Sequence, residues 1–216
     1  MNRLLVVAAH PAETAHLPAG TDVVLTGIGM SLAAAVTTRA VMERVPDPQD
    51  RAELTVVNLG SCGALKSGTD GLFEPSTVIN RDVDADLMRA MGSDPADTMA
   101  LVDLGQVGDG TVLATGDSFV AGGPVRDALA QRADLVDMEG FAVAVACRHL
   151  GVPLRMVKHV SDDADAQALN WADRVDISAR ALAEWFRAYT QSHDQDTDRV
   201  TSRSAEPVAT QGGHTA

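Results

Sequence analysis

Short apolar runs rich in β-branched residues alternate along this chain with longer segments rich in alanine and valine. The short runs have the length of buried strands, and the longer segments have the length of helices. Such alternation favours an α/β fold, in which helices cover both faces of a largely parallel sheet. We therefore predict a three-layer α/β/α sandwich around a mixed, largely parallel sheet. The expected strands are 4–9, 22–26, 54–59, 76–80, 111–114, 135–136 and 154–160, and the expected helices are 31–45, 124–132, 139–150 and 171–190.

The periodic pattern ends near residue 190 of the 216 residues, a length that suits one domain with a sizeable core. We predict a single domain over 1–190. Residues 191–216 are polar and aperiodic, so we predict that they form a disordered tail. The segment 81–110 is rich in Asp, Met and Gly without a clear period, and we interpret it as a loop that covers a site.

The composition excludes several classes of function. Asp and Glu number 30 against 17 Lys and Arg, and the resulting net charge of −13 disfavours binding to nucleic acid. Two cysteines rule out a disulfide scaffold, and no histidine pair has zinc spacing, so we expect no metal. No apolar run reaches the roughly 20 residues of a membrane span. We expect a cytoplasmic protein without membrane contact.

Polar residues follow several of the predicted strands. Carboxylates occur in three such segments, at Glu13, Glu139 and Asp162, and glycine-rich turns occur at 27–29 and 60–63. In open α/β sheets ligands bind beyond the carboxyl ends of the strands. We therefore expect these segments to meet at one edge of the sheet and to form an acidic site for a small molecule.

The turn at 27–29 does not complete a known cofactor motif. Leu32 stands where the dinucleotide fingerprint needs its third glycine, and the turn holds no lysine for a triphosphate loop. We predict no nicotinamide, nucleotide or other cofactor.

Five short motifs occur in a specific order, and together they resemble the nucleoside phosphorylase and nucleosidase superfamily. Members of this superfamily cleave the N-glycosidic bond of nucleosides. Within it the chain is most similar to the methylthioadenosine/S-adenosylhomocysteine nucleosidases, and the resemblance covers all of the chain but its tail. The motifs are Gly27–Met30, Asn58–Ala64, Thr115–Phe119, Val136–Glu139 and Val160–Asp162.

The resemblance implies a role for each matching residue. Glu13 matches the glutamate that activates the attacking water, and Asp162 matches the aspartate that protonates N7 of the leaving purine. Glu139 matches the carboxylate that binds the ribose hydroxyls. The other implied substrate-binding residues are Ser61 near the water, Phe119 against the purine ring, Gly29, Met138, and Trp171, which matches loosely an aromatic that closes over the site. The family is also expected to form a homodimer.

Cleavage of an N-glycosidic bond by water needs acidic and basic side chains of this kind. A nucleoside's C1′–N9 bond breaks through an oxocarbenium-like transition state, as other glycosidic bonds do. The base leaves poorly unless an acid such as Asp162 protonates it, and the positive charge on the sugar favours a carboxylate such as Glu139 nearby. On the opposite face a base such as Glu13 has to deprotonate water.

Each carboxylate also has a structural alternative. Glu13 could be a solvated loop residue, Glu139 a carboxylate favoured by a helix dipole, and Asp162 an N-cap. For Lys158, which lies among apolar residues, we favour an ion pair with Asp137 or Glu139 over a catalytic role.

The attacking group is expected to be water. Phosphate needs cations or a nest of donors. Phosphorylases with a similar Gly-Ser-Cys-Gly-Ala loop carry arginine where this chain has Asn58, and the turn 27–32 holds no Arg or Lys. We predict a nucleosidase for a purine nucleoside, and an aspartate at position 162 suits adenine, as in methylthioadenosine or S-adenosylhomocysteine. The alternatives are a phosphate-dependent phosphorylase and a silent nucleoside-binding protein. A departure from the family is Phe141, which either narrows the sugar end or packs internally.

Overall fold

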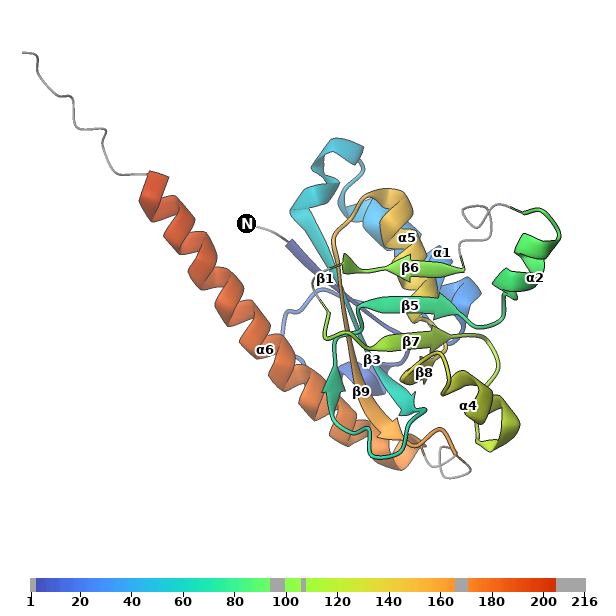
Figure 1. Ribbon diagram of the computed structural model, residues 1–216. Helices are drawn as coiled ribbons and strands as arrows, with labels where there is room; N and C mark the ends of the chain where they lie inside the picture. Colours follow the sequence, from blue (N-terminus) through green and yellow to red (C-terminus); the bar gives the residue numbers. More distant parts are fainter. Residues whose placement is uncertain (1–2, 94–99, 106–107, 166–170, 205–216) are drawn as a thin grey trace, which may run out of the picture.

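The computed structural model describes residues 3–93, 100–105, 108–165 and 171–204, and in the last helix the side chains of 174–192. Across these residues nine strands form one sheet, and helices lie on both of its sides (Figure 1). The strands are β1 (Arg3–Ala8), β2 (Val23–Leu25), β3 (Leu54–Ala64), β4 (Leu72–Phe73), β5 (Thr77–Asn80), β6 (Leu101–Asp103), β7 (Val112–Thr115), β8 (Leu135–Asp137) and β9 (Leu154–Asp162). The helices are α1 (Met30–Arg44), α2 (Ala85–Ala90), α4 (Gly123–Leu129), α5 (Gly140–Leu150) and α6 (Trp171–Ser204), with 3-10 turns η1 (Pro11–Thr14) and η2 (Pro48–Glu53).

The sheet is mixed and largely parallel, as predicted. Its main path runs β2-β1-β3-β8-β7-β5-β6, and β9 pairs with β3 and with β4. Neighbours run parallel except where β8 meets β3, β4 meets β9 and β6 meets β5. The chain therefore has the α/β class predicted from its alternating runs.

Burial on both faces explains why the strands are apolar without alternation. Leu5 and Val7 of β1 pack in a core cluster with residues of α1 and α5, whereas Val6 packs in a cluster with Leu182 and Phe186 of α6. Each side chain along the strand thus meets a helix, as in doubly covered sheets.

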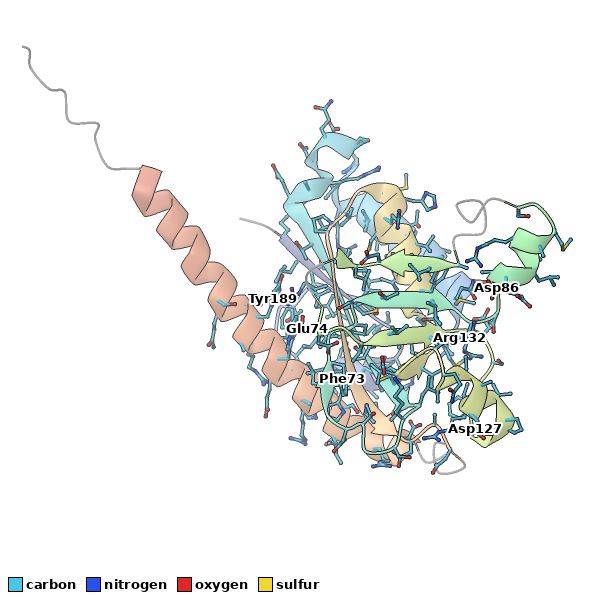
Figure 2. All side chains as sticks on the ribbon, in the orientation of Figure 1. Phe73, Glu74, Asp86, Asp127, Arg132 and Tyr189 are labelled. Atoms are coloured by element: carbon cyan, nitrogen blue, oxygen red, sulfur yellow. The ribbon has the colours of Figure 1, made fainter. Side chains whose placement is uncertain are left out.

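Polar and aromatic contacts hold α6 against the sheet. The indole N–H of Trp185 donates to Glu74 Oε1 at 3.0 Å, and Arg155 forms an ion pair with the same carboxylate at 2.5 Å. Trp185 also stacks on Tyr189, which lies near Glu74 (Figure 2). The helix then continues to Ser204, so the predicted end at residue 190 is wrong. An apolar period in a sequence marks a helix face that is buried against other elements. The projecting end of α6 in Figure 1 covers no sheet, so it has no such face. Residues 205–216 of the predicted tail lie outside the described residues.

Two other sequence interpretations need correction. The glycine-rich segment 60–63 is not a turn, because β3 continues through it to Ala64. The segment 81–110 is not one long loop, because it contains α2 and the edge strand β6 in its described parts. Glycine usually weakens a strand, but here it makes room for the side chains of the site: a Cβ at Gly63 would lie 3.1 Å from Asp162 Oδ1. No helix of the described residues is long and apolar enough to span a bilayer.

Candidate active site

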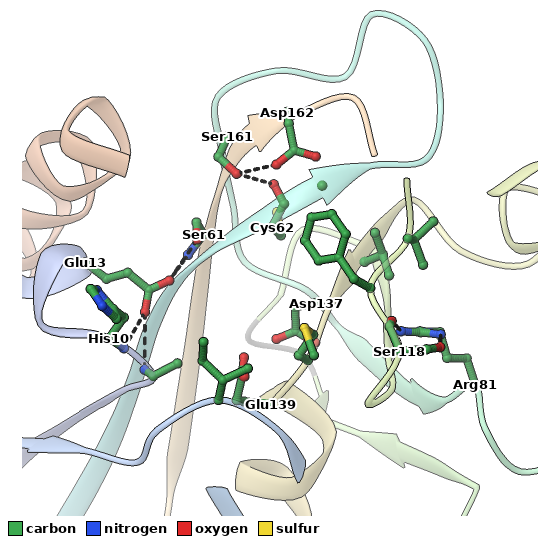
Figure 3. A pocket seen from close by; sticks show the side chains of 17 residues that line it. His10, Glu13, Ser61, Cys62, Arg81, Ser118, Asp137, Glu139, Ser161 and Asp162 are labelled. Carbon is green, nitrogen blue, oxygen red and sulfur yellow. Dashed lines mark hydrogen bonds between the residues drawn. The ribbon is translucent and has the colours of Figure 1, made fainter. Parts of the chain in front are cut away.

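A cavity of about 350 Å³ lies where several strands end, and it has the size of a site for a small ligand (Figure 3). Six residues predicted from the sequence line it: Glu13, Ser61, Phe119, Met138, Glu139 and Asp162. They come from η1, β3, the segment after β7, the β8–α5 junction and β9, and only the folded sheet brings these segments together.

Glu13 is buried and fixed by four donors. The backbone amides of Ala9 and His10 donate to Oε2 at 3.2 and 3.1 Å. The amide and the hydroxyl of Ser61 both donate to Oε1 at 2.8 Å. His10 completes the arrangement by capping η1, because its Nδ1 accepts from the amide of Ala12. The alternative of a solvated loop residue is therefore wrong, since Glu13 is only 4% exposed.

Asp162 ends β9 with its carboxylate held on both oxygens. The Ser161 hydroxyl lies 2.7 Å from Oδ2, and the amide of Ala164 donates to Oδ1 at 2.9 Å. Asp162 thus makes a short-range turn contact, as in the N-cap alternative, yet no helix begins within the described residues that follow it directly. Its buried side chain also lines the cavity, beside Ser161 and Cys62 (Figure 3).

Glu139 stands at the start of α5 and faces the start of α1. Its Oε1 accepts from the backbone amide of Gly29 at 2.8 Å. Gly29 contributes to the site through this hydrogen bond to Glu139. It does not itself line the cavity. Burial, and then repulsion from the Asp137 carboxylate, raise the pKa of Glu139 to about 7. Glu139 therefore changes charge in the physiological range.

Lys158 forms the ion pair that the sequence favoured. Its Nζ lies 2.9 Å from Asp137 Oδ2, and the two side chains are fully enclosed. Cys62 also lines the cavity, but burial raises the pKa of its thiol well above the usual range, which disfavours the thiolate that a nucleophile needs. The chemistry of the cavity therefore belongs to its carboxylates.

The segment 116–119 forms a further wall of the cavity, which Ser118 and Phe119 line. Arg81 donates to the Gly116 carbonyl at 2.9 Å and to the hydroxyl and carbonyl of Ser118. Asp82 accepts from the amide of Asp117 at 2.8 Å. These contacts hold the backbone that carries Phe119, whose ring is half exposed at the mouth of the cavity.

Sequence reasoning missed part of the lining. It left His10 undecided and did not single out Arg81 or Val120, which belong to no motif, or Ile28 and Ser118, which lie within two of the motifs but carry no implied role. Phe141 packs in the core with its amide bonded to Thr115 Oγ1, so it does not narrow the cavity. Trp171 begins α6, but its side chain lies outside the described residues. In the described part of the chain, no three His, Cys, Asp or Glu side chains are grouped to hold a metal.

The fold and the cavity define an α/β protein with a site for a small molecule at the ends of its strands. The family model of the phosphorylase superfamily matches residues 14–191, so the chain belongs to the phosphorylase superfamily. Two curated relatives indicate the branch. The 5′-methylthioadenosine/S-adenosylhomocysteine nucleosidase of Shewanella sp. (strain W3-18-1) is 31% identical over 172 residues, 68% of this chain and 71% of the relative. The aminodeoxyfutalosine nucleosidase of Helicobacter pylori (strain J99) is 32% identical over 80 residues, 36% of this chain and 35% of the relative.

Solved structures agree with this assignment of the fold. The 5′-methylthioadenosine/S-adenosylhomocysteine nucleosidase of Helicobacter pylori with butyl-thio-DADMe-Immucillin-A has a TM-score of 0.74 at 20% identity, covering 89% of this chain and 99% of that one. The futalosine hydrolase of Helicobacter pylori strain 26695 has a TM-score of 0.71 at 19% identity, covering 88% and 98%. The predicted superfamily, and the prediction of a nucleosidase, which is an N-glycosyl hydrolase, are confirmed by these relatives.

Proposed function

We propose that this chain hydrolyses the N-glycosidic bond of an adenine nucleoside such as methylthioadenosine or S-adenosylhomocysteine. The observation that carries the proposal is that the carboxylates of Glu13, Glu139 and Asp162 line one cavity and that each is held by different partners. The named activities of the relatives support the substrate class.

In this proposal Glu13 activates the water. Its four donors fix the carboxylate beside Ser61. A base has to be held within hydrogen-bond reach of the proton it removes. Ser61, whose hydroxyl meets Glu13 at 2.8 Å, would help to place the water.

Asp162 and Glu139 then act on the two parts of the nucleoside. Asp162 protonates N7 of the purine, so that the base leaves as a neutral molecule. Glu139 accepts hydrogen bonds from the ribose hydroxyls, and its charge stabilises the cationic sugar in the transition state. Phe119 and Met138 supply apolar contact for the flat base and the sugar.

Water is favoured over phosphate as the attacking group. At the start of α1 the amide of Gly29 donates to Glu139, and the amide of Met30 donates to Asp117 Oδ1 at 2.6 Å. The protein's own carboxylates thus occupy two of the donors that this helix N-terminus could offer an anion. Asn58 is buried and bonded to the Val7 carbonyl, away from the cavity lining.

The test is chromatographic detection of free base from methylthioadenosine, S-adenosylhomocysteine, adenosine and inosine, each with and without phosphate. We expect adenine from the first two, at rates that phosphate does not change, and little hypoxanthine from inosine. Release that depends on phosphate would establish a phosphorylase instead. Tight adenine binding without release from any nucleoside would establish a silent binding protein.

A second prediction concerns the wall that carries Phe119. Arg81→Ala removes the donors that hold Ser118 and Gly116, and we expect KM to rise about tenfold with kcat within about twofold, because a loosened wall weakens binding of the base. Steady-state kinetics with methylthioadenosine would measure both constants. Arg89→Ala on α2, which removes an exposed guanidinium outside the cavity, is the control. An unchanged KM for Arg81→Ala would contradict the role of the wall.

We further propose that the protein is a homodimer of the cytoplasm that serves methionine salvage. Half-exposed apolar side chains of Ile28, Leu32 and Phe119 lie near the mouth of the cavity and would suit contact with a second copy. Light scattering after size exclusion would give the oligomeric state.

A further inference from the structure

A buried ion pair borders the cavity. Lys158 comes from β9, and Asp137, which ends β8, lines the cavity. Asp137 Oδ1 accepts from the Thr115 hydroxyl at 2.5 Å, and Oδ2 accepts from the amide of Gly140 at 2.9 Å as well as from Lys158. The Asp137 carboxylate is therefore fixed at three points. Burying such a pair is costly unless its geometry is good, so its value need not lie in stability.

The charge of the Lys158 ammonium also acts on two other carboxylates of the site, Glu139 and Glu13. A Cβ at Gly60 would lie 3.1 Å from Lys158 Nζ and 3.4 Å from Glu13 Oε1, so the two groups approach each other in the space that a side chain at position 60 would fill. Burial alone would lower the pKa of Lys158, but attraction to Asp137, Glu139 and Glu13 outweighs it and raises that pKa. The ammonium group therefore stays charged beside the cavity.

We propose that Lys158 is a positioning residue whose ammonium group, anchored on Asp137, keeps Glu139 ionised for the sugar. The inference rests on the proposed function, in which Glu139 binds ribose as a carboxylate. Glu139 follows Asp137 by two residues at the start of α5, so the two negative charges repel each other. Lys158 offsets this repulsion, and its loss would leave Glu139 protonated at neutral pH.

Lys158 and Asp137 thus act on Glu139 with opposite signs, which separates this role from a merely structural one. A structural ion pair would lower activity equally at every pH when either partner is replaced. If the pair sets the charge of Glu139, replacing Lys158 and replacing Asp137 would move the pH profile of activity in opposite directions. Among the described residues, the charges that act on Glu139 are those of Asp137 from β8, Lys158 from β9 and Glu13 from η1, and the other charged or titratable groups in the lining of the same cavity are His10, Cys62, Arg81 and Asp162.

The test is the pH profile of kcat/KM between pH 5 and 9.5. For the wild type we expect activity to rise through about pH 7 as Glu139 ionises. Asp137→Asn keeps an oxygen for the donors around it, and we expect the rise to move down by about one pH unit. Lys158→Met should move it up by about one to two, so that activity at pH 6 falls roughly tenfold or more relative to activity at pH 9. Lys158→Arg should keep the wild-type profile.

Asp137→Asn decides the question even if Lys158→Met fails to fold, because it is nearly isosteric and leaves the ammonium facing Glu13 and Glu139. A profile of Asp137→Asn that does not move would overturn the inference, although base release itself would then stand. If the wild type releases no base, the proposed function fails, and thermal unfolding becomes the readout. The gain in stability from Glu139→Gln at pH 8 should then be smaller in the Asp137→Asn background, and an equal gain in both backgrounds would overturn the inference.

Discussion

Glu139→Gln is expected to lose almost all base release and, above pH 7, to unfold at a higher temperature than the wild type. The loss of activity follows because an amide cannot carry the negative charge that the cationic sugar needs, an effect of about 10²- to 10³-fold. The gain in stability follows from the raised pKa of Glu139, about 7 in the folded chain against 4.5 ordinarily. Between these two values the folded state holds a proton that the unfolded state releases. Stability is therefore lost as the pH rises through that window.

At pH 8 the full penalty applies, on the order of 2 to 3 kcal/mol, and glutamine removes it while its oxygen still accepts from the amide of Gly29. Thermal unfolding of both proteins at pH 5 and pH 8.5 measures the effect. We expect little difference at pH 5 and a clear gain at pH 8.5. A gain of the same size at both values would mean that the charge of Glu139 is not its cause.

Glu13→Gln should lose as much activity but should destabilise the fold. Without a base to deprotonate the water, we expect kcat to fall by about 10²- to 10⁴-fold. The amide nitrogen of glutamine would meet either the N–H groups of Ala9 and His10 or the donors of Ser61, and two donors cannot satisfy each other. The unsatisfied groups cost about 1 to 3 kcal/mol at all pH values near neutrality.

Single-turnover kinetics would measure the rate, and adenine binding by calorimetry would confirm that the folded site persists. Ser61→Ala is the matched control, because it removes one hydroxyl donor to Glu13 and leaves the carboxylate and the Ser61 amide in place. We expect a loss of about tenfold for this variant. A Glu13→Gln protein that binds adenine and retains the wild-type rate would assign the activation of water to another group.

Much of the fold could be predicted because burial leaves a direct mark on sequence. The strand β1 is apolar along most of its length, since helices cover both faces of the sheet. Helices and strands that bury no apolar face cannot be recognised in this way. The sequence does not predict three parts of the fold that carry no periodic apolar pattern. These are the end of α6 beyond residue 190, the edge strand β6 and the short strand β4. The glycines of 60–63 predict a turn when the sequence is taken alone. They are glycines because the side chains of Lys158 and Asp162 approach them, and both of these residues lie in another strand.

The sequence by itself determined the α/β class, the superfamily and the three carboxylates of the site, because strand and helix periods and short ordered motifs are local properties of the chain. Only the tertiary structure decided how those carboxylates differ. Glu13 receives four donors from three residues, whereas Glu139 receives one amide and sits beside Asp137. Charge state depends on burial and on neighbouring charges, and these come from strands and helices far apart in sequence.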